Sequence, residues 1–256
     1  MTRSPKRCED HAEPRDEFTL LCERCGYVIQ GLDETGPCPE CGTPIAHSLP
    51  RLARPGSPWQ QRPGARPLLA TIWAMYTRPD HTLRTLSIRD GSRGPGATVC
   101  LIASAVLITP VLMYVVSDYL NSSLRIGWPA IGEVIGAAGM ILGLGLLAWV
   151  ILLFLTFIEE AGIQMYGRVH KRRITNAVAE TVCAHACVGW ISGAFLLWVA
   201  IGLSVLEGWD AFTAGLAALA GLFLGLLHFE ALVWMGVRRC RYANRHRTPR
   251  AGAPDA

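Results

Sequence analysis

The sequence predicts an α-helical polytopic membrane protein, in which a four-helix transmembrane bundle follows a small cysteine-rich N-terminal domain. Of its 256 residues, 51% are hydrophobic and only 17% are charged, whereas about 25% are charged in an ordinary soluble domain. Residues 1–93 hold 13 Lys and Arg and 11 Asp and Glu, residues 94–237 hold 5 and 8, and residues 238–256 hold 6 and 1. A nearly charge-free middle between charged ends is typical of a membrane domain, and it excludes one soluble globule or a wholly disordered chain.

Two Cys-x-x-Cys-Gly motifs dominate the N-terminal region. Residues 1–17 are polar, with no apolar stretch after the first basic residues, so we expect a disordered lead and no cleavable signal peptide. Four thiolates close a tetrahedral zinc site, and two disulfides or a dithiol redox pair are the alternatives. The matched pairs and the missing signal peptide favour one structural Zn²⁺, without which residues 18–47 are too few to fold. The expected ligands are Cys22, Cys25, Cys38 and Cys41.

Over about residues 22–45 the chain resembles the short zinc ribbons of the CxxCGY…GL…CPxCG type. Such ribbons often stand at the start of bacterial membrane proteins. They serve as nucleic-acid binders, protein docks or structural caps, so the resemblance implies the metal and leaves these three roles open.

Two segments join this domain to the membrane region. Residues 48–67 are rich in proline, glycine and arginine, which predicts an extended linker. Residues 68–94 carry apolar side chains at helical spacing, interrupted at Arg78-Pro79. We expect one or two amphipathic helices lying at the membrane surface, with a plain juxtamembrane linker as the alternative.

Four apolar stretches within residues 95–237 predict four spans, since each exceeds the roughly 20 residues that cross a hydrocarbon core. Lys and Arg precede the first stretch, separate the second from the third and follow the fourth, while the other two connectors hold one Arg in total. The positive-inside rule then places both termini, including the basic tail 238–256, in the cytoplasm, at the cytoplasmic (inner) membrane. The stretches cover about 97–119, 130–158, 175–205 and 211–236.

Basic residues on the cytoplasmic side are expected to contact anionic lipid head groups, each contributing about 1 kcal/mol near the surface. Nucleic-acid binding by the ribbon and its arginine-rich flank is less favoured, because anionic lipid explains the same charges. The membrane-surface residues are Arg168, Lys171, Arg172, Arg173, Arg238 and Arg239.

Four ionisable residues fall inside the last two predicted spans: Glu180, His185, His228 and Glu230. Such residues are costly in a bilayer and are therefore functional candidates. They could meet to bind a metal ion, relay protons or hold a lipid head group. A hydrogen-bonded Glu–His pair that only fixes helix register is the simpler interpretation, and we favour it.

Glycines at GxxxG spacing predict close helix packing. Packing within the chain is favoured, and a homo-oligomer is the alternative. The glycines are Gly132, Gly136, Gly139 and Gly143 in the second stretch, and Gly221 and Gly225 in the fourth.

Over about residues 70–236 the chain resembles the bacterial members of the YIP-type membrane family. The similarity lies in a cytoplasmic N-terminal region, a short pre-membrane helix with Arg-Pro and a compact helical bundle. That family usually has five spans, and four are counted here. The resemblance implies a membrane-organising or adaptor role and brings no catalytic residues.

Enzymatic activity is not expected, because the chain contains no HExxH, GxSxG or Walker A motif. The first hypothesis is a membrane scaffold or adaptor whose cytosolic ribbon docks an unidentified protein. The alternative is a small transporter or ion-handling protein that uses the intramembrane Glu and His residues. Four spans are few for a transporter, and no inverted repeat is visible.

Overall fold

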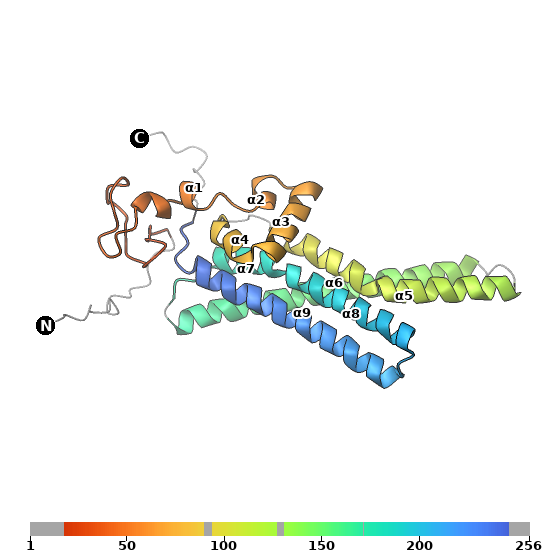
Figure 1. Ribbon diagram of the computed structural model, residues 1–256. Coiled ribbons are helices and arrows are strands. Elements are labelled where there is room, and N and C mark those ends of the chain that lie inside the picture. The colour runs from red at the N-terminus through yellow and green to blue at the C-terminus, as the bar shows by residue number, and fades with distance from the viewer. Residues whose placement is uncertain (1–17, 90–93, 127–130, 171, 246–256) are drawn as a thin grey trace.

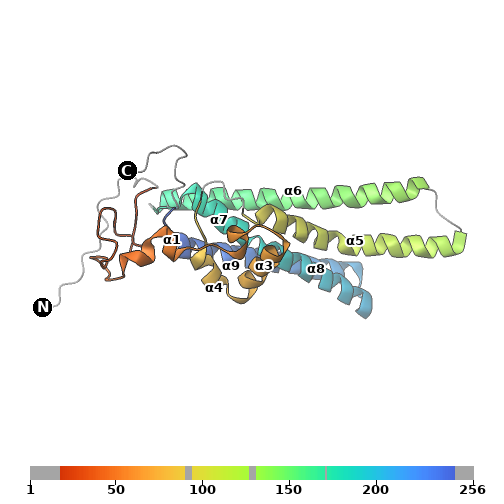
Figure 2. The ribbon, with the colours of Figure 1, turned by 90° about the horizontal axis from the view of Figure 1, so that it is seen from above.

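The computed structural model describes residues 18–89, 94–126, 131–170 and 172–245, and over these residues it is mostly helical with no β-strand (Figure 1). Two long hairpins, α5–α6 and α8–α9, run side by side, and the short helices cluster around one end of them (Figure 2). The elements are η1 (Ile45–Ser48), α1 (Pro50–Ala53), α2 (Pro58–Gln61), α3 (Ala65–Thr77), α4 (Pro79–Thr85), α5 (Gly96–Ile126), α6 (Ile131–Val169), α7 (Asn176–Ala186), α8 (Val188–Glu207) and α9 (Ala211–Cys240).

Three segments of the described chain are long and apolar enough to cross a membrane: Val134–Val169, Asn176–Glu207 and Phe212–Cys240. Four spans were expected. The first predicted stretch forms helix α5, whose segment Gly96–Pro110 is apolar, and a fourth span there stays a prediction. Large apolar side chains of α6, such as Leu142 and Phe157, remain exposed, as lipid-facing residues do. The chain is therefore a membrane protein by length and composition.

The third apolar stretch is two helices rather than one. The helix breaks at Cys187, between α7 and α8. Thr175 caps α7 by accepting a hydrogen bond from the Val178 amide. Most side chains of α7 are buried, because this helix packs against α5, α6 and α9. Helix α7 is therefore a core element of the helix cluster.

Glycines bring α8 and α9 into close contact. A Cβ added at Gly225 would overlap the backbone of Gly193, and one added at Gly189 would lie 2.5 Å from the Phe229 nitrogen. The GxxxG prediction therefore holds for α9. In α6, by contrast, a Cβ at any of the predicted glycines would meet no atom within 4 Å, so within-chain packing was the wrong expectation there. Those glycines are Gly132, Gly136, Gly139 and Gly143.

The segments expected to be a linker and surface helices form a helical cap. Helices α1 and α2 occupy 48–67, and a capping box at Ser57 and Gln60 starts α2. Helices α3 and α4 occupy most of 68–94, with the predicted break at Arg78-Pro79. The cap lies on the bundle: α4 packs against α9, and the Tyr76 hydroxyl of α3 donates to the Val188 carbonyl at 3.0 Å.

Candidate metal centre

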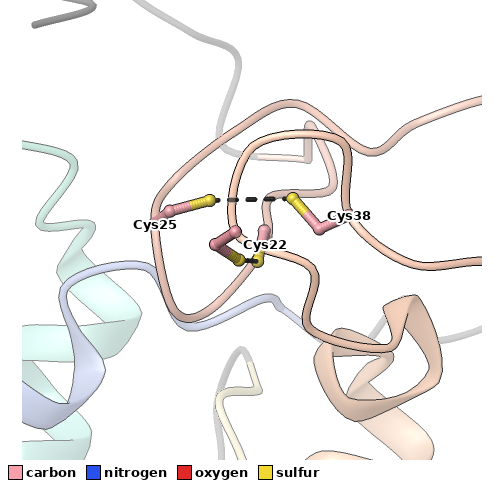
Figure 3. Close-up of side chains that lie close together, drawn as sticks. Cys22, Cys25 and Cys38 are labelled. Carbon is pink, nitrogen blue, oxygen red and sulfur yellow. Dashed lines mark hydrogen bonds between the residues drawn. The ribbon is translucent and has the colours of Figure 1, made fainter. Parts of the chain in front are cut away.

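The four predicted cysteine ligands converge. Their Sγ atoms all lie within 4.8 Å of one another. The Cys22 and Cys41 sulfurs are 3.6 Å apart, and those of Cys25 and Cys38 are 3.7 Å apart (Figure 3). Four converging thiols, two of them buried, match the donor set of a tetrahedral thiolate site. The arrangement can hold one metal ion.

Each Cys-x-x-Cys-Gly motif forms the same turn. In the first, the Cys22 amide donates to the Tyr27 carbonyl at 2.8 Å, and the Gly26 amide donates to the Cys22 carbonyl at 2.8 Å. The second repeats these bonds: the amide of Cys38 bonds to Thr43, and the amide of Gly42 bonds back to Cys38. Both glycines have positive φ, 79° and 69°, which is why glycine follows each pair. We call these turns the first knuckle (22–26) and the second knuckle (38–42).

Around the knuckles, the described strand pairing consists of two isolated bridges, Leu21 with Val28 and Pro37 with Pro44. Between the knuckles the Gly36 amide donates to the Asp33 carbonyl and closes a turn. Beside the cysteines, the core of this region contains few apolar side chains, chiefly Ile29 and Ile45. So small a core is typical of a domain that needs a metal.

Two of the four thiols have pKa values that are shifted in opposite directions. Burial raises the pKa of Cys25 to about 12. Hydrogen bonding with the side chain and backbone of Thr43 lowers the pKa of Cys41 to about 6. Metal binding would displace the protons that remain on the four thiols.

We call residues 18–47 the ribbon. Two buried polar side chains fix it to the rest of the chain, and neither was among the predicted site residues. Asn244 pairs with both backbone groups of Leu21, accepting from its amide at 2.9 Å and donating to its carbonyl at 2.6 Å. Arg54 bonds to the Glu23 carboxylate at 2.9 Å and to the Arg239 carbonyl at 2.9 Å. No local pattern marks either residue, since their partners lie far away in the sequence.

The two predicted intramembrane histidines have separate partners. His185 is fully buried, with Nε2 2.9 Å from the Ser57 hydroxyl and Nδ1 2.8 Å from the Thr181 carbonyl. The Nδ1 atom of His228 lies 2.8 Å from the Ser192 hydroxyl. These bonds join α7 to the cap and α8 to α9. Among the described residues, neither histidine forms a hydrogen bond with Glu180 or Glu230.

The glutamates also lie in different surroundings. Glu180 is exposed on α7. Glu230 lines a cavity of about 200 Å³ between α6 and α9, together with Glu159, Tyr166 and Trp234. Glu159 is thus a carboxylate that the predicted cluster left out, although its position near the end of an apolar stretch could have indicated it.

The predicted basic residues serve several purposes. Arg172 and Arg238 lie over the rings of Tyr166 and Trp234, at 5.3 and 4.8 Å from their centroids. Arg173 donates to the Thr19 carbonyl of the ribbon at 2.6 Å. Arg239 pairs with Asp80, and Arg168 is exposed, whereas Lys171 lies outside the described residues.

Comparison of the chain with protein-family models, curated proteins and solved structures gave no match. The resemblance to the YIP-type family gains no support from these comparisons. The functional argument therefore rests on the cysteine cluster, the membrane-capable helices and the contacts between them.

Proposed function

We propose that this protein is a scaffold or adaptor of the cytoplasmic membrane, whose zinc ribbon docks a cytosolic protein. In this proposal α5 is the first of four spans, both termini are cytoplasmic, and the cysteines bind one structural Zn²⁺. Thiolate ligands and a reducing compartment both favour zinc over a disulfide framework. An organising role is also what the YIP-type resemblance implies.

The attachment of the ribbon to the bundle is the observation that carries the proposal. Asn244 is 1% exposed and Arg54 is 2% exposed, and both bond to the ribbon. A ribbon on a free tether needs no such contacts. A ribbon held in one orientation presents one surface at a defined height above the membrane, which is what a docking platform requires.

The surface offered for docking is apolar. Tyr27, Val28 and Leu32 are each 37–38% exposed, and they lie on the loop between the two cysteine pairs. Large apolar side chains rimmed by polar residues mark protein interaction sites. Two exposed acidic residues, Asp33 and Glu34, directly follow Leu32 in the sequence. The partner is therefore expected to combine an apolar patch with basic residues.

Proximity labelling from the N-terminus, in native cells, tests the docking role. The double variant Val28→Asp, Leu32→Asp should lose its labelled cytosolic partner while the chain still binds its metal. Leu69→Asp changes an apolar residue on α3 that is even more exposed, at 64%, and should keep the partner. An unchanged set of labelled proteins in the double variant would contradict ribbon docking.

A second candidate, the binding and movement of an organic cation, is favoured by one observation. Glu159 of α6 and Glu230 of α9 line the same cavity as the aromatic rings of Tyr166 and Trp234. Two carboxylates that line one cavity suit an ammonium group, and the two rings already bind cations, since Arg172 and Arg238 lie over them. A Cβ at Gly162, which also lines the cavity, would meet no atom within 4 Å, so space is open there.

Uptake of tetramethylammonium into vesicles that contain the protein tests this candidate. Gly162→Leu should fill the cavity and abolish uptake without removing a charge. Gly143→Leu adds the same side chain at an equally open position on α6, away from the cavity, and should retain uptake. Absence of uptake by the unmodified protein would eliminate the candidate.

A further inference from the structure

Within the described part of the chain, the first knuckle contacts the C-terminal end of α9 and the residues that follow it, and the second knuckle does not. A Cβ added at Gly26, in the first knuckle, would lie 2.7 Å from the Tyr242 ring. At Gly42, the equivalent position of the second knuckle, it would meet no atom within 4 Å. The first knuckle is therefore the docked side of the ribbon. We call its contact with residues 239–244 the knuckle interface.

The knuckle interface is polar at its centre although it is buried. Glu23 lies in sequence between the ligands Cys22 and Cys25. Its carboxylate accepts from Arg54 Nε at 2.9 Å and from the backbone amide of Asn244 at 3.2 Å. Leu21 directly precedes the first ligand, and the Asn244 side chain satisfies both of its backbone groups. Residues on both sides of a metal ligand thus hold the C-terminal segment.

The same arginine also holds the end of α9 itself. Arg54 donates through Nη2 to the Arg239 carbonyl at 2.9 Å, and its Nη1 lies 3.5 Å from Cys240 Sγ. Cys240 has no exposed surface. If Glu23 moved away, a buried guanidinium would lose its carboxylate, and water would have to enter to solvate it. Arg54 therefore makes the position of α9 depend on the shape of the first knuckle.

The shape of the first knuckle depends in turn on the metal. Without metal, the sulfurs keep only weak hydrogen bonds, to one another and, at Cys41, to Thr43, and the small core around Ile29 and Ile45 remains. Domains of this size and composition lose their structure with the metal. Loss of the metal would therefore remove Glu23 and Leu21 from their partners together.

We propose that metal occupancy of the four-cysteine centre controls the C-terminal end of α9: the metal-loaded first knuckle holds residues 239–244 in place, and metal loss releases them. The released segment carries Arg239 and Arg241, which are then available to another partner. This inference rests on the metal ligation proposed above and is independent of ribbon docking. It makes the ribbon a metal-dependent switch as well as a platform.

Alkylation of Cys240 in the full-length protein in detergent tests the switch. N-ethylmaleimide labelling would be mapped by mass spectrometry before and after chelation, with the metal content measured in each sample. Chelation that removes one metal per chain should raise Cys240 alkylation at least tenfold. Cys100, equally buried but located in α5, should remain protected and so exclude general unfolding.

A second variant separates the interface from the metal. Asn244→Ala keeps all four cysteines, so it should bind one metal and yet show high Cys240 alkylation in the loaded state. Thr35→Ala removes the hydrogen bonds that the Thr35 hydroxyl donates to the Asp33 carboxylate, within the ribbon turn, and should leave Cys240 protected. Continued protection of Cys240 after measured metal loss would overturn the switch alone. A purified protein that binds no metal would overturn the metal proposal as well.

Discussion

The side chain of Asn244 occupies the place that a neighbouring strand would take beside Leu21, accepting from its amide and donating to its carbonyl at 2.9 and 2.6 Å. The same Nδ2 atom donates to the Ser48 carbonyl at 2.7 Å. The side-chain amide of Asn244 therefore joins three segments: the start of the first knuckle, the end of η1 and the segment after α9.

Asn244→Ala should speed amide hydrogen exchange at Leu21 about 100-fold. The change leaves three buried backbone groups without partners, at about 1 kcal/mol each or more, and 1.4 kcal/mol corresponds to tenfold. Exchange measured by mass spectrometry on the metal-loaded protein reports this directly. Asn176→Ala alters an exposed asparagine at the start of α7 and should change exchange at Leu21 little. Equal exchange in the two variants would mean that Asn244 does not hold the ribbon.

Gly26→Ala should destabilise the ribbon more than Gly42→Ala. Both positions have positive φ, so each alanine costs about 1–2 kcal/mol of backbone strain. Only at Gly26 does the added methyl group also meet Tyr242. Metal affinity, measured by competition with a chromophoric chelator, should therefore fall further for Gly26→Ala. The difference should shrink when Tyr242→Ala is combined with Gly26→Ala, and a difference that persisted would place its cause elsewhere.

Asp80→Asn should reduce stability at neutral pH but not in acid. Burial, the largest single cause, raises the pKa of Asp80, but the hydrogen bonds and charges of Arg239 and Arg84 together outweigh it and lower the pKa overall. A carboxyl whose pKa is lower in the folded state stabilises above its unfolded pKa of about 3.9, and this contribution is lost as the pH falls through the folded-state value.

The Asp80 side chain is 45% exposed, so we expect a difference below about 1 kcal/mol at pH 7. Thermal unfolding of the two proteins at pH 7 and at pH 3 would measure it. The two melting temperatures should converge at pH 3. A difference in melting temperature between the two proteins that is larger at pH 3 than at pH 7 would contradict the assigned ion pairs.

Gly225→Leu should prevent α8 and α9 from packing, whereas Gly139→Leu should be tolerated. A side chain at Gly225 would overlap the backbone of Gly193, and backbone cannot rotate aside. Overpacking of a core commonly costs about 1–3 kcal/mol, and a leucine between two helix backbones is expected at or above that range. Gel filtration in detergent should show loss of monodisperse protein only for Gly225→Leu. Equal behaviour of the two variants would refute the assigned helix contact.

The parts of the structure that could be predicted are those specified by short-range patterns. The ligand set follows from two cysteine pairs, because the spacing within each pair fixes a local turn. The apolar stretches follow from composition, and so does the general class of the protein. The break at Arg78-Pro79 follows from proline chemistry, since proline disfavours a helical residue before it.

The parts that could not be predicted depend on contacts between distant residues. Arg54 lies in a segment rich in proline and arginine, which favours a solvated side chain, yet Glu23 and the Arg239 carbonyl bury it. His185 was placed with other membrane residues, but its partner, Ser57, comes from the cap. Helix α7 has the apolar composition of a span although protein surrounds most of its side chains, because hydropathy does not distinguish lipid from a protein interior.

The contact between Leu21 and Asn244 joins residues that are 223 positions apart. At about 5–20 residues per second, a ribosome needs roughly 10–45 s to cover that distance. The first knuckle is therefore complete, and able to take up metal, well before its docking partner has been translated. During that interval the backbone groups of Leu21 are open to solvent, and a bound metal would be the main support of the nascent ribbon.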